Sequence, residues 1–199
     1  MHFRISSLLT TLSLIAALAA LTPIATHAAA IVLHQPVPLQ QESIAALRHS
    51  LQPQDQDHWK LVFFGFAHCK EICPVSMAKL SMLIKAAAKA QVKVNGIFVT
   101  VDPDRDTDTI LSSYAKSFGD NLSHLRLEGE QLERFKTSFG VEALFYTKNA
   151  GNTQHYQVDH STTAFLIDPH GNIRILFDAL DDATTLAKMF SEDEDLFKL

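Results

Sequence analysis

The chain has 199 residues, of which 47% are hydrophobic and 20% are charged, and its formal net charge is −5. This composition is typical of a soluble globular protein, and the acidic balance excludes a nucleic-acid binder or a polybasic membrane binder. Once the N-terminal segment is set aside, about 170 residues remain, enough for one domain with a substantial core.

The first 30 residues have the layout of a secretory signal peptide. Arg4 precedes an uncharged run over residues 5–25, and small residues at 28–30 provide an Ala-x-Ala cleavage site. An uncleaved membrane anchor is the alternative, because the uncharged run approaches the ~20 residues that span a bilayer. Removing the segment takes away Arg4 as its only charged residue, so the net charge changes from −5 to −6. We expect residues 31–199 to form an exported, periplasmic domain, either released or anchored to the inner membrane facing the periplasm.

Apolar patterning predicts alternating strands and helices after this segment, although residues 31–57 are ambiguous. The expected elements of the first half are a short helix opening at 43–47, a loop at 52–55, a buried strand at 61–66, a helix begun by Pro74 and a strand at 92–101. Pro74 suits a helix start, because its missing N–H would have no helical partner there. The apolar face of its helix consists of Met77, Leu80, Leu83, Ile84 and Ala87.

The second half continues the alternation. Its expected elements are a helix capped by Asp106 or Thr107 and ended by Gly119, a strand at 125–127, a helix at 132–139 ended by Gly140, a strand at 156–158, a hairpin of 163–167 and 173–177, and a last helix carrying Leu186, Met189 and Phe190. A β-α-β-α unit followed by a hairpin and a closing helix describes an α/β, thioredoxin-like fold, with a central mixed sheet flanked by helices.

The two cysteines, Cys69 and Cys73, are separated by three residues at the turn from a strand into a helix. A disulfide across so short a loop removes only about 2 kcal/mol of unfolded-chain entropy, against about 4.7 kcal/mol for a hundred-residue loop. The pair therefore favours redox or metal chemistry over a structural bridge. The start of a helix stabilises a thiolate, and in an exported protein the two thiols would pair by default.

Three segments resemble motifs of the SCO/SenC family of copper-binding assembly factors for cytochrome c oxidase. They are the cysteine segment at 64–74, the segment Val-Asp-Pro-Asp-Arg-Asp-Thr at 101–107, and Asp-His-Ser-Thr at 159–162. Lys70 and Glu71 stand where the family has Pro and Asp. The resemblance covers residues 59–190 and implies the thioredoxin-like fold.

The resemblance implies that Cys69, Cys73 and His160 bind one copper ion per chain, as Cu(I) or Cu(II). Thiolate sulfur favours Cu(I), and imidazole nitrogen also suits Cu(II). A closed structural zinc site would need a fourth protein ligand, and the chain has no third cysteine.

His160 is preferred among the ten histidines because of its place in the fold. It lies between two predicted strands, on the loop that faces the first helix of a thioredoxin-like domain. The resemblance points to the same residue. His68 adjoins Cys69 and is expected to point away from it. His155 and His170 are expected to lie on the surface or in turns.

Residues 101–107 have two interpretations. They form a turn with a helix cap and an internal ion pair between Arg105 and a carboxylate, or they support the copper site as a second shell or docking surface. No metal ligand is assigned there.

Three functions from different classes fit these residues. The resemblance implies a copper metallochaperone, not itself an enzyme, that delivers copper to the binuclear CuA centre of cytochrome c oxidase. The alternative is a thiol–disulfide oxidoreductase that reduces the CuA-site cysteines through a redox-active Cys69–Cys73 disulfide and does not need His160. A thiol peroxidase is disfavoured, because Lys70 replaces the threonine of the peroxiredoxin motif. The expected partners are the copper-accepting subunit of a respiratory oxidase and a thioredoxin-like reductant.

Overall fold

The computed structural model describes residues 30–177 and 183–198. The elements in chain order are β1 (Ala30–Pro38), α1 (Gln41–His49), a 3-10 turn (Pro53–Asp55), β2 (Trp59–Gly65), α2 (Ile72–Lys89), β3 (Val94–Thr100), α3 (Asp108–Lys116), β4 (Leu122–Leu125), α4 (Gly129–Ser138), β5 (Ala143–Tyr146), β6 (Gln157–His160), β7 (Ala164–Ile167), β8 (Asn172–Phe177), α5 (Ala183–Glu192) and a second 3-10 turn (Glu194–Phe197). The predicted leader, residues 1–30, lies outside this description except for Ala30. Within the described ranges, no helix is both long and apolar enough to cross a membrane.

Six strands form one mixed sheet in the order β1-β8-β7-β2-β3-β4. The pairs β2–β3 and β3–β4 are parallel, whereas β7 runs antiparallel to both β2 and β8. The β7–β8 pair is the hairpin predicted from the turn residues at 168–172. The α/β class with a central mixed sheet is therefore confirmed.

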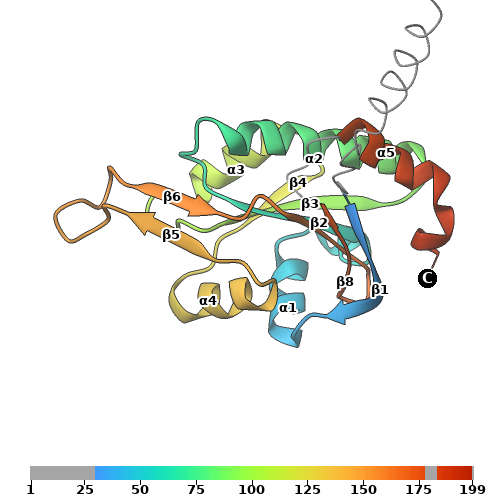
Figure 1. Ribbon diagram of the computed structural model, residues 1–199, viewed down its shortest axis with the longest axis horizontal. Helices are drawn as coiled ribbons and strands as arrows, with labels where there is room; N and C mark the ends of the chain where they lie inside the picture. The colour runs from blue at the N-terminus through green and yellow to red at the C-terminus, as the bar shows by residue number, and fades with distance from the viewer. Residues whose placement is uncertain (1–29, 178–182, 199) are drawn as a thin grey trace, which may run out of the picture.

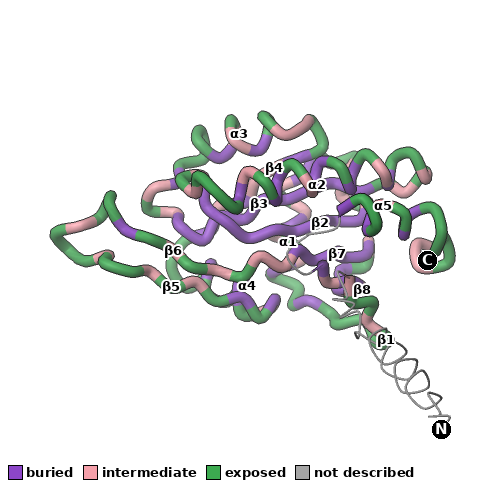
Figure 2. The backbone as a smooth tube through the Cα atoms, turned by 45° about the horizontal axis from the view of Figure 1, so that its top comes forward, coloured by how far each residue is buried: buried purple, intermediate pink, exposed green. Residues whose placement is uncertain are grey.

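Helices cover both faces of this sheet (Figure 1). The helices α2, α3 and α5 lie on one face, and Ser81 of α2 donates a hydrogen bond to the carbonyl of Phe118 just after α3. The helices α1 and α4 lie on the other face, where the hydroxyls of Ser43 and Ser138 bond to each other. Every residue of β2 and β3 is buried between these layers (Figure 2), as expected for continuous apolar strands with helices on both sides.

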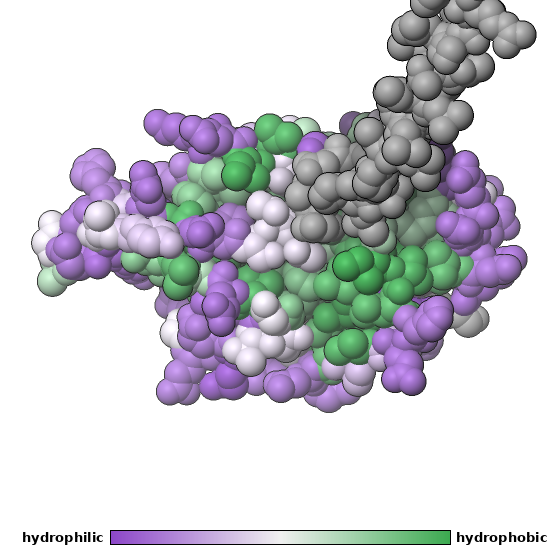
Figure 3. All heavy atoms as spheres, in the orientation of Figure 1, coloured by the Kyte–Doolittle hydropathy of each residue, from purple (hydrophilic) through white to green (hydrophobic). Residues whose placement is uncertain are grey.

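The first edge strand, β1, is an element that the sequence left ambiguous. It pairs antiparallel with β8 and includes Pro36 and Pro38, which fit an edge because proline cannot donate to a second neighbour. Ile31, Val32 and Val37 are exposed. Hydrophobic side chains accordingly gather over the β1–β8 side of the molecule (Figure 3).

Several predicted boundaries shift by one to three residues, and two of the differences involve β4 and α2. The strand expected at 125–127 is β4, Leu122–Leu125, which pairs in register from Gly96 with Leu122 to Val99 with Leu125. Gly96 permits this register because it has no Cβ: a Cβ there would lie 2.3 Å from Leu122 Cδ2 and would clash with it. The helix expected to begin at Pro74 begins at Ile72, so proline occupies its first turn.

Strands β5 and β6 form a separate two-stranded sheet, which we call the ribbon. The ribbon projects from the body of the molecule (Figure 1), and its strands alternate between exposed and half-buried residues. Strand β5 was not predicted, and β6 extends through His160 where a loop was expected. Four residues with half-buried alternation give too weak a pattern for prediction.

Candidate metal centre

The two cysteines occupy the turn from β2 into α2, as predicted. The backbone N–H of Cys69 donates to the carbonyl of Phe66, which closes the turn. Cys73 lies in the first turn of α2, and its backbone N–H points at Cys69 Sγ at 3.5 Å. Both cysteines are free thiols in this structure. One end of the helix thus presents both sulfur atoms.

Cys69 is the more accessible and more acidic thiol. Partial burial opposes ionisation, but hydrogen bonds from the backbone N–H groups of Cys73, Glu71 and Ile72 outweigh it, so the pKa of Cys69 lies below its ordinary value. These donors are the unpaired N–H groups of the helix start. Cys69 therefore ionises more readily than an ordinary cysteine, which suits an attacking or metal-binding thiol.

Cys73 has the opposite character, since it is completely buried. Burial is the main cause that raises its pKa to about 12, and the charge of Cys69 adds to the effect. Gly65 leaves room for the buried side chain of Cys73. A Cβ at position 65 would lie only 2.7 Å from Phe98 Cε2 and 3.1 Å from Cys73 Sγ, so a larger residue would displace them. The second thiol is therefore held against the central sheet and stays protonated until a metal or a partner sulfur replaces its proton.

His160 reaches the cysteines from the last residue of β6. Its Nε2 lies 3.7 Å from Cys73 Sγ, although 87 residues separate the two in the chain. The Nδ1–H donates to the carbonyl of Ser161 at 2.8 Å, which leaves the lone pair of Nε2 facing the sulfur. The rings of Phe63 and Phe66 pack edge-on against the imidazole, with centroids 6.3 and 5.8 Å away. Burial lowers the pKa of His160, so the neutral, ligating form predominates at pH 7.

The three predicted ligands thus lie at one place, but they are not yet closed around a metal. In residues 30–177 and 183–198, no three His, Cys, Asp or Glu side chains already form a metal-binding group. The donor set of two sulfurs and one imidazole nitrogen fits copper. Binding would require the loss of the thiol protons and a closer approach of the donors.

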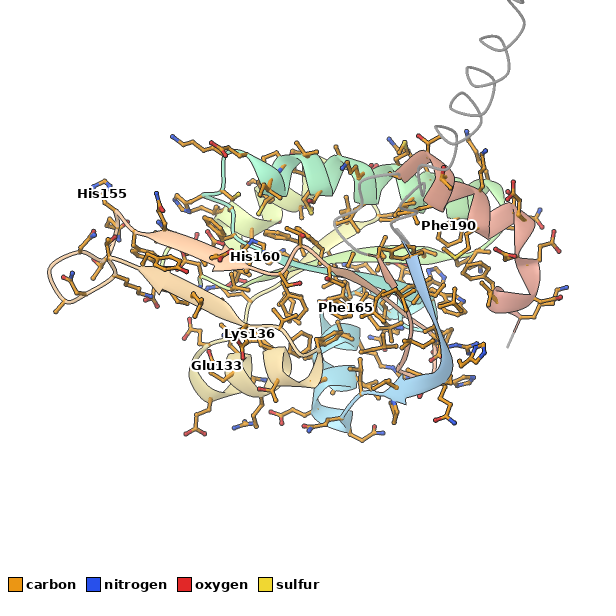
Figure 4. All side chains as sticks on the ribbon, in the orientation of Figure 1. Glu133, Lys136, His155, His160, Phe165 and Phe190 are labelled. Carbon is orange, nitrogen blue, oxygen red and sulfur yellow. The ribbon has the colours of Figure 1, made fainter. Side chains whose placement is uncertain are left out.

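His68, His155 and His170 lie where the sequence predicted. His68 is 46% exposed, and its Nδ1 lies 3.1 Å from Asp106 Oδ1. His155 is exposed at the far end of the ribbon, whereas His160 lies at the end that joins the body (Figure 4). His170 is exposed in the β7–β8 turn. Among the described residues, none of these three histidines forms a hydrogen bond with a cysteine sulfur.

The segment 101–107 combines its two interpretations. Thr107 caps α3 by accepting from the backbone N–H of Ile110, and Arg105 pairs with Asp102, as the turn interpretation predicted. Asp106 is not the cap; its buried carboxylate accepts the backbone N–H of Ala67 at 2.9 Å, just before the cysteines. The segment therefore also supports the turn that carries the cysteines.

Tyr156 is the main residue of this region whose contact the sequence did not predict. Its hydroxyl donates to the carboxylate of Asp102, and its ring lies under the guanidinium of Arg105 at 3.7 Å. An aromatic residue just before a predicted strand has no distinguishing signal, because its partners lie more than fifty residues earlier in the chain.

Comparison with known proteins gives consistent matches. The SCO1/SenC family model matches residues 50–192. A SCO2-like protein of Rickettsia prowazekii is 34% identical over 116 residues, which are 57% of this chain and 55% of the relative. The chain thus spans about half the length of the curated relatives it matches.

Solved structures match over more of the chain. Copper-bound ScoI of Arabidopsis thaliana is 26% identical, with a TM-score of 0.65 over 81% of this chain and 98% of that one. Copper-bound ScoI of Bradyrhizobium japonicum is 27% identical, with a TM-score of 0.58 over 78% and 98%. These matches confirm the thioredoxin-like fold.

Proposed function

Because the chain belongs to the SCO1/SenC family, we propose that it is a copper metallochaperone that delivers copper to the CuA centre of cytochrome c oxidase. One copper ion, as Cu(I) or Cu(II), would be held by Cys69, Cys73 and His160. The observation that carries this proposal is the distance of 3.7 Å between Cys73 Sγ and the unprotonated Nε2 of His160. An imidazole aimed at a buried thiol adds a nitrogen donor to a metal site, whereas disulfide exchange does not need one.

The environment of each donor suits capture and release of the cargo ion. Cys69 is accessible and acidic, so it offers the first thiolate to an incoming ion. Cys73 and His160 then complete a partly buried set, in which the loss of the Cys73 proton is coupled to metal binding. An acceptor with soft ligands of its own can take the ion by replacing the more accessible sulfur, that of Cys69, first.

A thiol–disulfide oxidoreductase is the second candidate. The difference between the two thiols in pKa and accessibility favours it. The thiolate of Cys69 would attack one sulfur of an acceptor disulfide, and the other acceptor sulfur would leave as a thiolate. Cys73, once deprotonated, would attack Cys69 in this mixed disulfide and release the second acceptor thiolate. The acceptor gains two electrons and the chain becomes a Cys69–Cys73 disulfide, which a thioredoxin-like reductant would reduce.

Copper binding and complementation together separate the two functions. The reduced protein should bind one copper ion tightly and the oxidised protein should not, because the disulfide consumes both sulfurs. His160→Ala should weaken retention, most for Cu(II), and should fail to restore oxidase activity in cells without the wild type at ordinary copper levels. His155→Ala, at the far end of the ribbon, is the matched control. Normal oxidase assembly by a stably folded His160→Ala protein under copper limitation would contradict copper delivery and favour the reductase.

We place the domain in the periplasm, either released or anchored to the inner membrane. The uncharged run at residues 5–25 and the small residues at 28–30 support export. Protein recovered from the periplasm should begin near residues 29–31 by N-terminal mass analysis. An intact leader in the membrane fraction would establish the anchored form.

A further inference from the structure

The nitrogen donor of the proposed copper site is attached to the least supported part of the fold. His160 ends β6, and the ribbon pairs only within itself. Much of the ribbon is exposed or half-buried (Figure 2). Strand pairing within the ribbon therefore does not explain why the imidazole lies beside Cys73. The rings of Phe63 and Phe66 pack against the imidazole itself, and a further contact joins the body to the ribbon.

Arg105 makes that contact. It lies in the segment between β3 and α3, and its side chain is only 6% exposed. Its Nε donates to Asp102 Oδ2 at 2.5 Å, while its Nη1 donates to the carbonyls of Tyr156 at 3.0 Å and Gln154 at 3.2 Å. The guanidinium also stacks over the Tyr156 ring. One planar fork thus joins the body to the chain that leads into β6.

The body side of this contact is rigid. Asp102 is fully buried directly after β3, and its backbone N–H donates to Thr100 Oγ1 at 3.0 Å. The Asp102 carboxylate accepts Arg105 on one oxygen and the hydroxyl of Tyr156 on the other. Tyr156 stands just before β6 and His160 ends it, so Arg105 fixes the start of the strand that carries the histidine.

We propose that Arg105 is a positioning residue that holds the imidazole of His160 beside the sulfur of Cys73. The inference rests on the proposed copper function, and it extends that function to a residue that touches neither copper nor a donor atom. A second contact, between Lys148 and Asp104, lies nearer the surface, with side chains 27% and 62% exposed. Solvent weakens such a pair, so it cannot replace the buried fork of Arg105.

Arg105→Lys tests the proposal, because lysine keeps the positive charge beside Asp102 but has a single nitrogen in place of the planar guanidinium, whose Nε bonds the carboxylate while Nη1 bonds the two carbonyls. In the reduced, metal-free protein, the nuclear Overhauser contact between the His160 ring and the Cys73 side chain should be lost. Tyr156→Phe removes only the hydroxyl bond and should weaken the same contact less. Arg134→Lys is the matched control, since Arg134 forms exposed ion pairs with Glu42 and Glu130 on the outer helices.

A double-mutant cycle in copper affinity separates positioning from general stability. Arg105→Lys should lower the affinity for Cu(II), measured against a chromophoric chelator, by about 10- to 100-fold, as other outer-shell changes do. In a His160→Ala background the same change should alter the affinity less than about twofold, because its only route to copper has been removed. Additive losses, or unchanged affinity in Arg105→Lys, would overturn the proposal.

The same experiment distinguishes this inference from the proposed function. If His160→Ala leaves the Cu(II) affinity unchanged, the proposed ligand set is wrong. The ring contact in the metal-free protein then decides the role of Arg105 by itself: its loss in Arg105→Lys supports positioning, and its persistence overturns it.

Discussion

The body of the molecule and the ribbon supply different donors and are built in different ways. The body holds both sulfurs between a fully buried pair of strands and the first turn of a long helix. The ribbon holds the imidazole on two strands of four residues, where Leu144 and Tyr146 are 54% and 49% exposed. The candidate metal centre lies where these two regions meet.

This difference indicates that the site can open without unfolding the domain. Regions with few buried apolar contacts open at a lower free-energy cost than the core. The sulfurs should therefore keep their positions, whereas the imidazole should keep its position only while the contacts between the ribbon and the body, those of Arg105 among them, are intact. Such a division suits a protein that must bind an ion firmly and then give it up.

The largest expected effect contrasts core and ribbon in the free energy of unfolding. Phe64 is fully buried in β2 and packs against the rings of Phe135, Phe139 and Phe165. Phe64→Ala should cost about 3–5 kcal/mol, because it leaves a cavity among these rings. Leu144→Ala on the ribbon should stay within about 0.5 kcal/mol. Urea unfolding monitored by circular dichroism measures both, and similar losses would remove the distinction between the two regions.

The next effect distinguishes the two sulfurs within the body. The lowered pKa of Cys69 and the raised pKa of Cys73 predict that Cys69 reacts with iodoacetamide roughly 100-fold faster at pH 7.5. The Cys73→Ala and Cys69→Ala variants report each thiol separately. In 8 M urea both should react at the same rate, which provides the control. Equal rates in the folded protein would mean that Cys73 is not held against the sheet.

The smallest effect concerns the other end of β2, where Lys60 is buried and donates to the carbonyls of Gln56 and His58. Burial, followed by the charge of Arg48, lowers the pKa of Lys60 from 10.5 to about 8. The unfolded chain therefore binds more protons between these two values, and the free energy of unfolding should rise with pH across that range. Allowing for solvent screening, we expect a gain of about 1–2 kcal/mol.

Lys60→Met supplies the comparison, because it removes this titration and leaves the others. The difference in urea midpoint between pH 8 and pH 10 should be larger for the wild type than for the variant. An identical pH dependence in both proteins would show that Lys60 ionises normally and that this end of the core admits water.

Much of the fold was predictable because its signals are local. The apolar run of β2, the cap at Thr107 and the turn residues at 168–172 each indicate an element within a few residues. The strands β1 and β5 escaped prediction for the opposite reason. Their partners, β8 and β6, define them as strands, and an exposed edge strand or a half-buried short strand has no distinctive pattern of its own.

The sequence by itself determined the chemistry: two thiols at the start of a helix, a histidine between two strands, and an acidic segment after β3. Only the tertiary structure decided how these groups differ and what holds them. It lowered the pKa of Cys69 and raised the pKa of Cys73, because burial and helix N–H groups depend on packing rather than on spacing. It also joined Arg105 to the backbone of Tyr156, a contact across 51 residues that no local pattern can encode.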